Sequence, residues 1–250
     1  MGYRPRFQKM SEKRSYNIVC PRCHHPMDVE LYESINVKQE PDLKQQLLVN
    51  QINSVKCTEC ELQFRVDKPL VYSDPDHQLL IYWFPHREDN FEVGEERFGA
   101  WLEEIGAVMP DGVRAPDVHL VFTRTELVER IFLKEAGLDE RVVEYIKYVI
   151  YTKNAQRLDP LAKILLFNAQ DSTDDELCFV VQDAATRQLE AVLKYSREAY
   201  KALCETFGQE EKTADLLELF PGPYISARAL MRRDSLDEIL EEPEDPSDQR

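Results

Sequence analysis

The sequence predicts an α+β fold built in two parts. Two Cys-x-x-Cys pairs lie within the first 60 residues, among short segments in which apolar and polar residues alternate as in β-strands. After residue 97, segments with a helical spacing of apolar residues are mixed with strand-like segments. Charge separates the same two parts, because residues 1–72 contain 11 basic and 9 acidic residues, whereas residues 73–250 contain 20 and 38.

The composition predicts a folded protein with charged, unstructured ends. Of the 250 residues, 43% are hydrophobic, which is enough to bury one substantial core or two smaller ones. Residues 1–14 carry five cations against one acid and predict a flexible basic tail. Residues 233–250 have no apolar residue after Leu240 and predict a disordered acidic tail. We therefore expect an N-terminal domain over 15–85 and an acidic α+β domain over 97–232.

Two further features limit the location and the partners of the chain. No apolar run reaches the roughly 18 residues that a membrane span needs, and the first residues lack the apolar region of a signal peptide. The protein is therefore expected to be soluble and cytoplasmic. A net charge of −16 disfavours general coating of nucleic acid, because that affinity comes mainly from basic groups that displace counterions at phosphates.

Four of the six cysteines indicate a metal site. Cys20 and Cys23 form one Cys-x-x-Cys pair, and Cys57 and Cys60 form the other. Two intervening residues let both sulfurs of a pair reach one ion from a tight turn, and two such turns complete a tetrahedral thiolate shell with Zn–S distances of about 2.3 Å. A full shell leaves no coordination position for water, so we expect one structural Zn²⁺ and no catalytic one.

Two other roles for these cysteines stay open. A redox dithiol needs only one pair in a βαβ context, whereas here the pair is duplicated and flanked by strand-like segments. Structural disulfides are unexpected in a chain without a secretory signal. The other two cysteines, Cys178 in an apolar run and Cys204 on an apolar helix face, are expected to be small buried hydrophobes.

The 33 residues between the two pairs predict folded structure. Residues 29–37 alternate like a strand, Pro41 begins a short helix, and residues 62–66 alternate again after the second pair. The N-terminal part is thus expected to be a zinc ribbon with a helix inserted between its halves. Residues 69–73 and 77–84 are rich in strand formers and predict a hairpin that extends the sheet of the ribbon.

His24 and Glu61 each follow the second cysteine of a pair. This place usually holds glycine, because the backbone of such a turn adopts a positive φ. We do not expect His24 or His25 to be a ligand, since four cysteines already fill the tetrahedron. Both histidines are expected to be exposed residues of the turn.

These residues resemble the CpXC family, which is named for the Cys-Pro-x-Cys pair that is here Cys20-Pro21-Arg22-Cys23. The similarity extends from about residue 16 to about residue 182 and is most specific in the first 75 residues. It implies a bacterial protein that binds zinc through the four cysteines and has no established activity. His24 and Glu61 depart from the usual glycines of the family. Further similar stretches are Ser34-Ile35-Asn36-Val37, Pro41-Asp42-Leu43-Lys44, Pro69-Leu70-Val71-Tyr72-Ser73-Asp74, Glu126-Leu127-Val128-Glu129-Arg130-Ile131 and Gly137-Leu138-Asp139-Glu140-Arg141-Val142.

The second part is predicted to contain both helices and strands. Thr123 with Glu126 can form a capping box for a helix over 126–136, and Asp139 can cap the helix that follows. The other elements expected are a polar linker over 85–96, a short helix over 98–106, strands over 116–122, 162–167 and 177–182, a long helix over 186–207, and a strand or helix over 224–230.

No catalytic motif is found in this part, because the sequence contains no phosphate-binding loop, no nucleophile elbow and no His-Glu-x-x-His pair. Its acidic groups at 139–140 and 174–176 are expected in caps and turns rather than in a catalytic cleft. Tyr145, Tyr148 and Tyr151 are expected to complete a core or an interface.

The functional prediction is a zinc-binding adaptor or protein-binding module without catalysis, whose partner is another protein. Two alternatives stay open. One is an enzyme whose site in the acidic domain converges only in three dimensions. The other is a ribbon that binds nucleic acid through nearby cations, namely Arg4, Arg6, Lys9, Arg14, Arg22 and Lys56.

Overall fold

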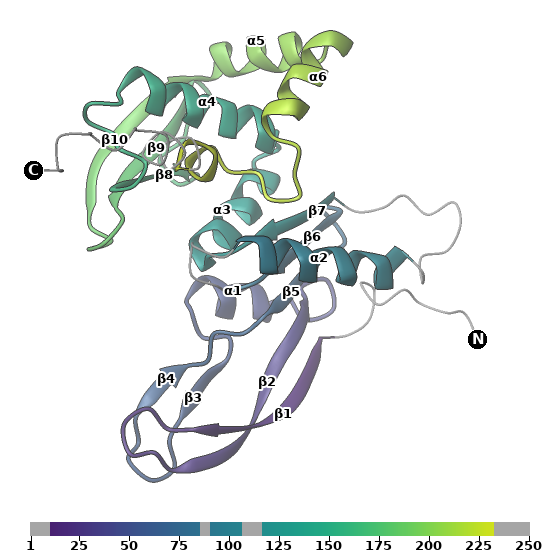
Figure 1. The fold of residues 1–250 in the computed structure, drawn as a ribbon, viewed down its shortest axis with the longest axis vertical. Helices are drawn as coiled ribbons and strands as arrows, with labels where there is room; N and C mark the ends of the chain where they lie inside the picture. The colour runs from purple at the N-terminus through teal and green to yellow at the C-terminus, as the bar shows by residue number, and fades with distance from the viewer. Residues whose placement is uncertain (1–10, 86–90, 107–116, 233–250) are drawn as a thin grey trace, which may run out of the picture. The chain divides into compact units, whose positions relative to one another are not determined.

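The computed structural model describes residues 11–85, 91–106 and 117–232 (Figure 1). Helices and strands are both present and the strands form three sheets, which confirms the predicted α+β class. The chain divides into two compact units, residues 1–131 and residues 132–250. Within the described residues, no helix is long and apolar enough to cross a membrane.

A five-stranded sheet lies at the centre of the first unit. Its order is β1-β2-β5-β6-β7, with antiparallel pairs β1/β2 and β5/β6 and parallel pairs β2/β5 and β6/β7. The hairpin expected over 69–84 is present as β5 and β6, and the strand expected over 116–122 is β7. The bounds are β1 Glu12–Val19, β2 Pro26–Asn36, β5 Leu70–Asp74, β6 Leu79–Trp83 and β7 Asp117–Val121.

The connection from β2 to β5 holds a helix and a separate hairpin. Helix α1 (Asp42–Leu48) begins after Pro41 as predicted and buries Leu43 and Leu47 against the sheet core. Its last turn is closed by Arg124, whose guanidinium donates to the backbone oxygens of Leu47 and Leu48 at 2.8 and 2.7 Å. Strands β3 (Ser54–Lys56) and β4 (Gln63–Arg65) then pair with each other as a two-stranded sheet.

The N-terminal basic tail is a wrong prediction from Glu12 onward, because residues 12–14 begin β1. Their charges suit an exposed edge strand, where long side chains can lie along neighbours and keep their charged ends in water. The Nζ of Lys13 lies 4.5 Å from the centre of the Tyr32 ring, and the Nε of Arg14 lies 3.2 Å from Glu33. The rest of that tail up to residue 10, like the acidic tail predicted over 233–250, lies outside the described residues.

Helix α2 (Phe91–Gly106) begins earlier than the helix expected over 98–106. The predicted linker over 85–96 is therefore wrong for residues 91–96, while residues 86–90 lie outside the described residues. Gly94 allows the first part of α2 to pack closely against aromatic side chains. A Cβ at Gly94 would lie 2.2 Å from the ring of Phe122 and 3.2 Å from that of Phe84, so only glycine lets the helix approach these aromatics.

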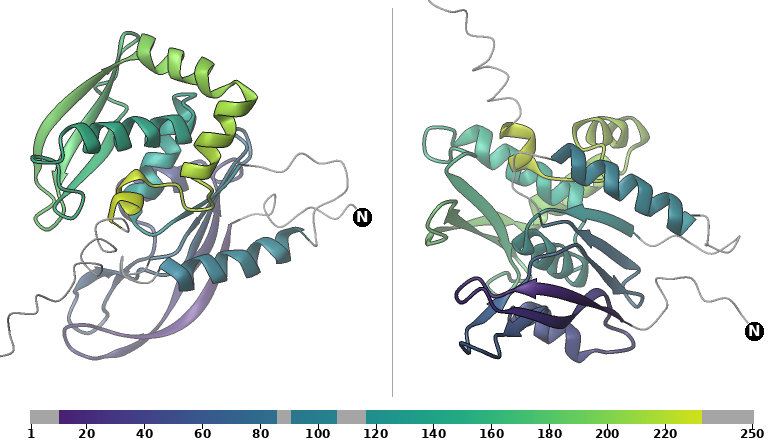
Figure 2. Two further views of the ribbon diagram at one scale, coloured as in Figure 1. Left: turned by 45° about the horizontal axis from the view of Figure 1, so that its top comes forward. Right: turned by 60° about the horizontal axis from the view of Figure 1, so that its bottom comes forward.

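The second unit packs helices on a three-stranded antiparallel sheet with the order β10-β9-β8. Helix α4 lies against one face of this sheet (Figure 2), where Val143 and Ile146 share a buried core with Phe179. Residues 227–232 are helical and overlap the segment 224–230 that was expected as a strand or helix. The bounds are α3 Arg124–Glu135, α4 Glu140–Lys153, β8 Lys163–Asn168, β9 Glu176–Asp183, β10 Leu189–Ser196, α5 Arg197–Phe207 and α6 Glu210–Leu219.

Both predicted caps are present. The backbone N–H groups of Phe122 and Thr123 donate to the Glu126 carboxylate at 3.0 and 2.9 Å, and the N–H of Glu126 donates to the Thr123 hydroxyl at 3.1 Å. At the start of α4, the Asp139 carboxylate accepts the N–H of Val142 at 3.0 Å. These caps fix where α3 and α4 begin.

The long helix predicted over 186–207 is wrong, because β10 occupies its first half and α5 begins only at Arg197. The spacing of Leu189, Val192 and Leu193 fits a helix, but Val192 and Tyr195 also have high strand propensity and pair with β9. Ser196 then caps α5 by accepting the N–H of Ala199 at 3.3 Å.

The compact units divide later than the domains expected over 15–85 and 97–232. Strand β7 belongs to the first unit because it pairs with β6. Residues 124–131 of α3 belong there too, since Leu127 and Ile131 are fully buried in the same core as Tyr72 and Ile81. Whether residues 15–85 and 97–232 fold as independent domains therefore stays a prediction.

Candidate metal centre

The two Cys-x-x-Cys pairs form turns with the same backbone hydrogen bonds. In the first turn, the N–H of Cys20 donates to the backbone oxygen of His25, and the N–H of His24 donates to that of Cys20, both at 3.0 Å. In the second turn, Cys57 donates to Leu62 at 2.8 Å and Glu61 to Cys57 at 3.0 Å. We call residues 20–25 and 57–62 the first and second knuckle.

His24 and Glu61 adopt the backbone conformation that glycine would supply. Their φ angles are 57° and 58°, in the left-handed region. The departure from glycine therefore leaves the geometry of both knuckles intact, at the expense of conformational strain at two residues with a Cβ.

Each knuckle closes a hairpin. The first lies between the end of β1 at Val19 and the start of β2 at Pro26, and the second lies between β3 and β4. The predicted strands that flank the cysteines are thus present, and the strand pairing presents both sulfurs of each pair on one side of a turn. The helix expected between the halves is α1.

The sulfurs of Cys20, Cys23, Cys57 and Cys60 all lie within 4.8 Å of one another. The Sγ atoms of Cys20 and Cys60 are 3.6 Å apart, as are those of Cys23 and Cys57. Four sulfurs at 2.3 Å from a central ion would be about 3.8 Å apart in a regular tetrahedron, whereas a disulfide would bring two to about 2.05 Å. The spacing therefore fits a metal ion, and all the cysteines are free thiols.

Burial divides the four thiols into two kinds. Cys20 and Cys57 are 0% and 1% exposed, whereas Cys60 is half-buried and Cys23 is exposed. Burial disfavours the thiolate of Cys20, but the backbone N–H groups of Cys23 and Arg22, together with the thiols of Cys23 and Cys60, outweigh it and lower the pKa of Cys20 to about 6.

The neighbouring sulfurs act on Cys23 in the opposite direction. The backbone N–H of His25 favours the Cys23 thiolate, but desolvation and the sulfurs of Cys60, Cys20 and Cys57 together raise its pKa to about 12. Four thiolates this close repel one another strongly unless a cation lies between them. A metal cation at the centre of the four sulfurs would therefore favour the thiolate form of all of them.

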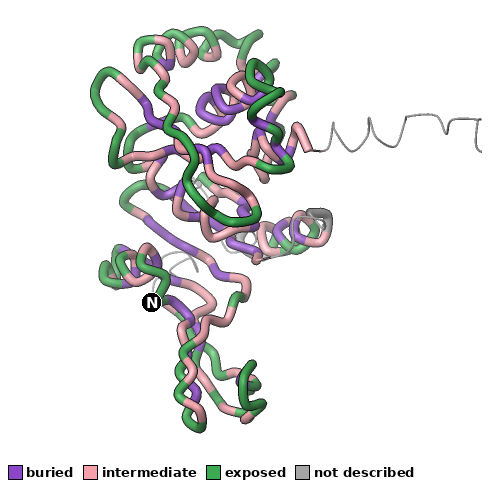
Figure 3. Tube along the Cα trace, turned by 90° about the vertical axis from the view of Figure 1, so that its left-hand side faces the viewer, coloured by how far each residue is buried: buried purple, intermediate pink, exposed green. Residues whose placement is uncertain are grey.

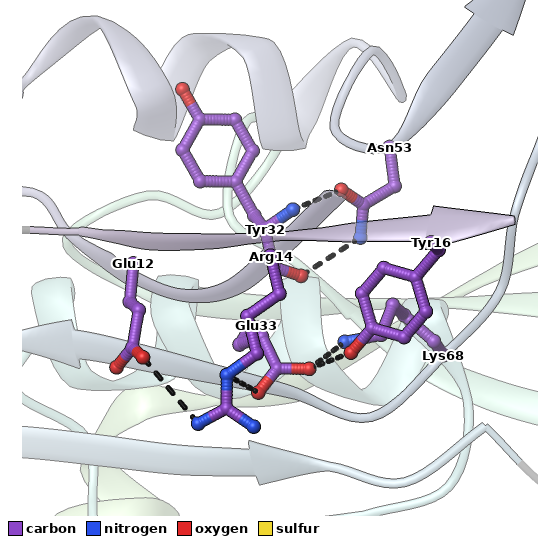
Figure 4. Close-up of polar contacts among 7 residues, drawn as sticks. All are labelled: Glu12, Arg14, Tyr16, Tyr32, Glu33, Asn53 and Lys68. Atoms are coloured by element: carbon purple, nitrogen blue, oxygen red, sulfur yellow. Dashed lines mark hydrogen bonds and ion pairs between the residues drawn. The ribbon is translucent and has the colours of Figure 1, made fainter. Parts of the chain in front are cut away.

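The amide side chain of Asn53 links the two hairpins that carry the knuckles (Figure 4). Asn53 directly precedes β3, and its Oδ1 accepts the N–H of Tyr32 in β2 at 2.7 Å. Its Nδ2 donates to the backbone oxygen of the same residue at 3.1 Å. This contact holds the second hairpin beside the first and so contributes to the distance between the knuckles.

A second polar cluster stabilises the first hairpin around Glu33 (Figure 4). Its carboxylate lies 2.6 Å from Lys68 Nζ and 3.2 Å from Arg14 Nε, and it accepts the hydroxyl of Tyr16. Burial raises the pKa of Glu33, but Lys68, Tyr16 and Arg14 outweigh it, so that the pKa lies below its usual range. No local motif marks Asn53, Glu33 or Lys68 in the sequence, because each contacts a segment that is distant in the chain.

The other sequence candidates do not join a site. Cys178 is buried and its thiol donates to the backbone oxygen of Asp171 at 3.0 Å, and Cys204 is half-buried in α5. Asp139 is a helix cap, and Asp174 and Asp175 are exposed in the turn before β9. Within residues 11–85, 91–106 and 117–232, the four knuckle cysteines form the one group of His, Cys, Asp or Glu side chains that could hold a metal ion.

Comparison with known proteins gives a family for the chain. A family model described as CpXC protein matches residues 18–147, which is 130 of the 250 residues. The matched range contains both knuckles, Asn53, Glu33 and Lys68. Searches of curated proteins and of solved structures found no match. The chain therefore belongs to the CpXC family.

Proposed function

We propose that the four knuckle cysteines bind one structural Zn²⁺ and that the zinc-bound hairpins form a zinc ribbon that recognises another protein. The observation that supports this most is the spacing of 3.6 Å between sulfurs of opposite knuckles. Such a shell is complete with four thiolates, and it leaves no place for a substrate or a catalytic water.

Zinc is favoured by the donor set. Thiolates are soft ligands, and a tetrahedral set of four sulfurs is typical of zinc and of iron. Zinc has no redox chemistry and suits a site whose task is structural. The hairpins also need such support, because β3 and β4 are three residues long each and offer little apolar surface to bury.

A protein partner is favoured over nucleic acid by the charges around the knuckles. Among the cations that were candidates for phosphate contact, Arg14 is paired with Glu33 at 3.2 Å and Lys56 with Glu61 at 3.2 Å. Val19, next to the first knuckle, leaves 54% of its surface exposed, which suits an apolar partner surface. Arg22 is exposed, while Arg4, Arg6 and Lys9 lie outside the described residues.

The metal is tested first, by elemental analysis of the purified full-length protein. We expect about one zinc per chain, lost when Cys20 and Cys23, or Cys57 and Cys60, are replaced together by serine. Cys178→Ser with Cys204→Ser is the matched control and should keep its zinc. Bound iron instead of zinc, or a double knuckle variant that retains full zinc, would contradict the proposal.

The partner is tested separately, by capture from lysate with the wild type and the zinc-free variants, read by mass spectrometry. The proposal expects proteins that bind the wild type and the control variant but not the knuckle variants. Binding of DNA or RNA at low salt, lost in an Arg22→Ala variant with intact zinc, would instead favour the nucleic-acid function, because phosphate contacts are strongest there.

A further inference from the structure

Two strand edges in this protein are covered by specific side chains. In the second unit, Tyr151 of α4 covers the outer edge of β8, where its hydroxyl accepts the N–H of Leu165 at 2.9 Å and donates to the backbone oxygen of Lys163 at 3.1 Å. Asn53 does the same for β2 in the first unit. Unpaired backbone groups at an edge invite pairing with another strand, and such side chains prevent it.

The opposite edge of the three-stranded sheet, β10, has no such cover among the described residues. The N–H of Arg197, just after β10, donates at 2.8 Å to the backbone oxygen of Asp175, just before β9, so Arg197 faces β9. In an antiparallel pair, alternate residues face the partner strand, so Leu193 and Tyr195 also bond β9, opposite Phe179 and Leu177. The backbone N–H and C=O groups of Val192 and Lys194 therefore point outward.

The same edge exposes apolar side chains. Leu189 and Val192 leave 67% and 55% of their surface exposed. Figure 1 shows β10 at the outer side of its sheet. The residues of β10 are exposed except Leu193 and Tyr195, which are half-buried; Figure 3 colours the chain by burial from that side. The other long edge strand, β1, differs because its first residues are Glu12, Lys13 and Arg14, and charges of this kind protect an edge from pairing.

We propose that β10 pairs antiparallel with β10 of a second copy of this chain, around a two-fold axis at Leu193. Val192 of each copy would then exchange two hydrogen bonds with Lys194 of the other, which gives four new backbone bonds and joins two three-stranded sheets into one of six strands. A two-fold axis makes the pattern of donors and acceptors complementary without any further requirement.

Charge disfavours one neighbouring register. Between Ala191 and Tyr195, β10 carries a single charged residue, Lys194. With the axis at Leu193, Lys194 lies opposite Val192 of the second copy, so its aliphatic stem covers the exposed valine and no like charges meet. A shift that centres the axis on Lys194 would place the two lysines opposite each other, which is unfavourable. On the other face of the strand, Leu193 meets Leu193.

The net charge of −16 predicts the salt dependence of this dimer. Two acidic chains repel each other at long range, and salt screens that repulsion, with a Debye length of about 10 Å at 0.1 M. Hydrogen bonds and apolar contacts at the strand edge are little affected. Dimerisation should therefore strengthen as salt rises, opposite to an interface held by ion pairs.

The test measures the mass of the full-length protein by sedimentation equilibrium. We expect a reversible dimer for the wild type. Val192→Lys should weaken it by roughly tenfold or more, because two pairs of lysines then lie opposite each other. Val192→Glu should keep the dimer, since each glutamate then faces Lys194 of the other copy, and it leaves the contact of Lys194 with Glu176 at 2.6 Å in place. Leu161→Lys, an exposed residue outside β10, is the matched control and should dimerise like the wild type.

Hydrogen exchange shows whether the outer edge of β10 forms the dimer contact. The amides of Val192 and Lys194 should be protected in the dimer and exchange fast in Val192→Lys, whereas Leu193 and Tyr195 stay protected in both because they bond β9. A wild type that is monomeric at all concentrations in high salt would overturn the proposal. A dimer that Val192→Lys leaves intact, or one without protection at Val192 and Lys194, would also overturn it.

Discussion

The side-chain amide of Asn53 bonds both backbone polar groups of Tyr32, at 2.7 Å from the N–H and 3.1 Å to the C=O. It takes the place of a strand at the edge of β2, just before β2 begins to pair with β5 at Ser34. Asn53 also has a φ of 55°, a conformation that asparagine tolerates better than most residues. One residue therefore makes a turn before β3 and attaches the second hairpin to the first.

Asn53→Ala should lower the free energy of unfolding by about 2–3 kcal/mol, because it leaves the N–H and C=O of Tyr32 without partners. Asn53→Gly removes the same two bonds but accepts the positive φ, so it should be less destabilising by about 1 kcal/mol. Urea unfolding of the metal-loaded protein measures both values. Equal stability of Asn53→Ala and the wild type would show that the amide contributes nothing.

Replacing either of the two knuckle residues that have a positive φ by glycine should stabilise the fold. His24→Gly removes a left-handed residue with a Cβ, at φ 57°, and should raise the free energy of unfolding by about 0.5–1 kcal/mol after the greater flexibility of the unfolded chain is subtracted. Glu61→Gly should gain slightly less, since it also loses an exposed ion pair with Lys56.

Thermal unfolding of the metal-loaded protein measures these gains. His25→Gly is the matched control. It stands next to His24 without a positive φ, so it should destabilise the protein by the usual cost of glycine. If His24→Gly and His25→Gly lower the melting temperature equally, strain at His24 is not what limits the knuckle.

The close approach of the four cysteines was predictable from the sequence because local spacing encodes it. Two residues between cysteines favour a tight turn, and repetition of the pair indicates that the two turns share one site. The glycine rule correctly marked His24 and Glu61 as positions of positive φ. Asn53 and Glu33 were missed because each acts on a residue that is distant in the chain, and a single sequence does not encode which strand lies beside which.

The segment 186–207 shows where local pattern fails. Leu189, Val192 and Leu193 fit one face of a helix, yet Leu189 and Val192 are exposed on a strand edge. Spacing alone does not separate these outcomes when apolar residues are three and four apart. Pairing with β9 decided the structure, and that is a tertiary interaction. The predicted caps at Thr123 and Asp139 succeeded because a cap is a contact within four residues.

Glu33→Gln should reveal the pH dependence of the first hairpin. The pKa of Glu33 is lower in the folded chain, so its carboxylate stabilises the fold above its ordinary pKa, and this contribution is lost as pH falls through the folded value. We expect the variant to be less stable than the wild type by about 1–2 kcal/mol at pH 7 and equally stable well below pH 4.

Urea unfolding from pH 7 down to acid tests this dependence as a difference between the two proteins, which cancels the effect of metal loss at low pH. Asp28→Asn is the control, because that exposed carboxylate contacts Asn17 on the same hairpin. Its effect should stay within about 0.5 kcal/mol. A constant difference between Glu33→Gln and the wild type at every pH would mean that Glu33 acts through its shape and not its charge.

Tyr151→Phe should open the edge of β8. Tyr151 is fully buried, and its hydroxyl satisfies the N–H of Leu165 and the backbone oxygen of Lys163. Removing one oxygen leaves both groups without this partner, at an expected cost of about 2 kcal/mol in urea unfolding. Tyr148→Phe, on the same helix and only partly buried, should cost less than about 0.5 kcal/mol. Hydrogen exchange at Leu165 should accelerate in Tyr151→Phe beyond the loss of global stability, because its amide is then open to water. If exchange of the Leu165 amide slows, or accelerates only as much as the loss of global stability predicts, another group covers this edge. The contrast between β8 and β10 then no longer holds.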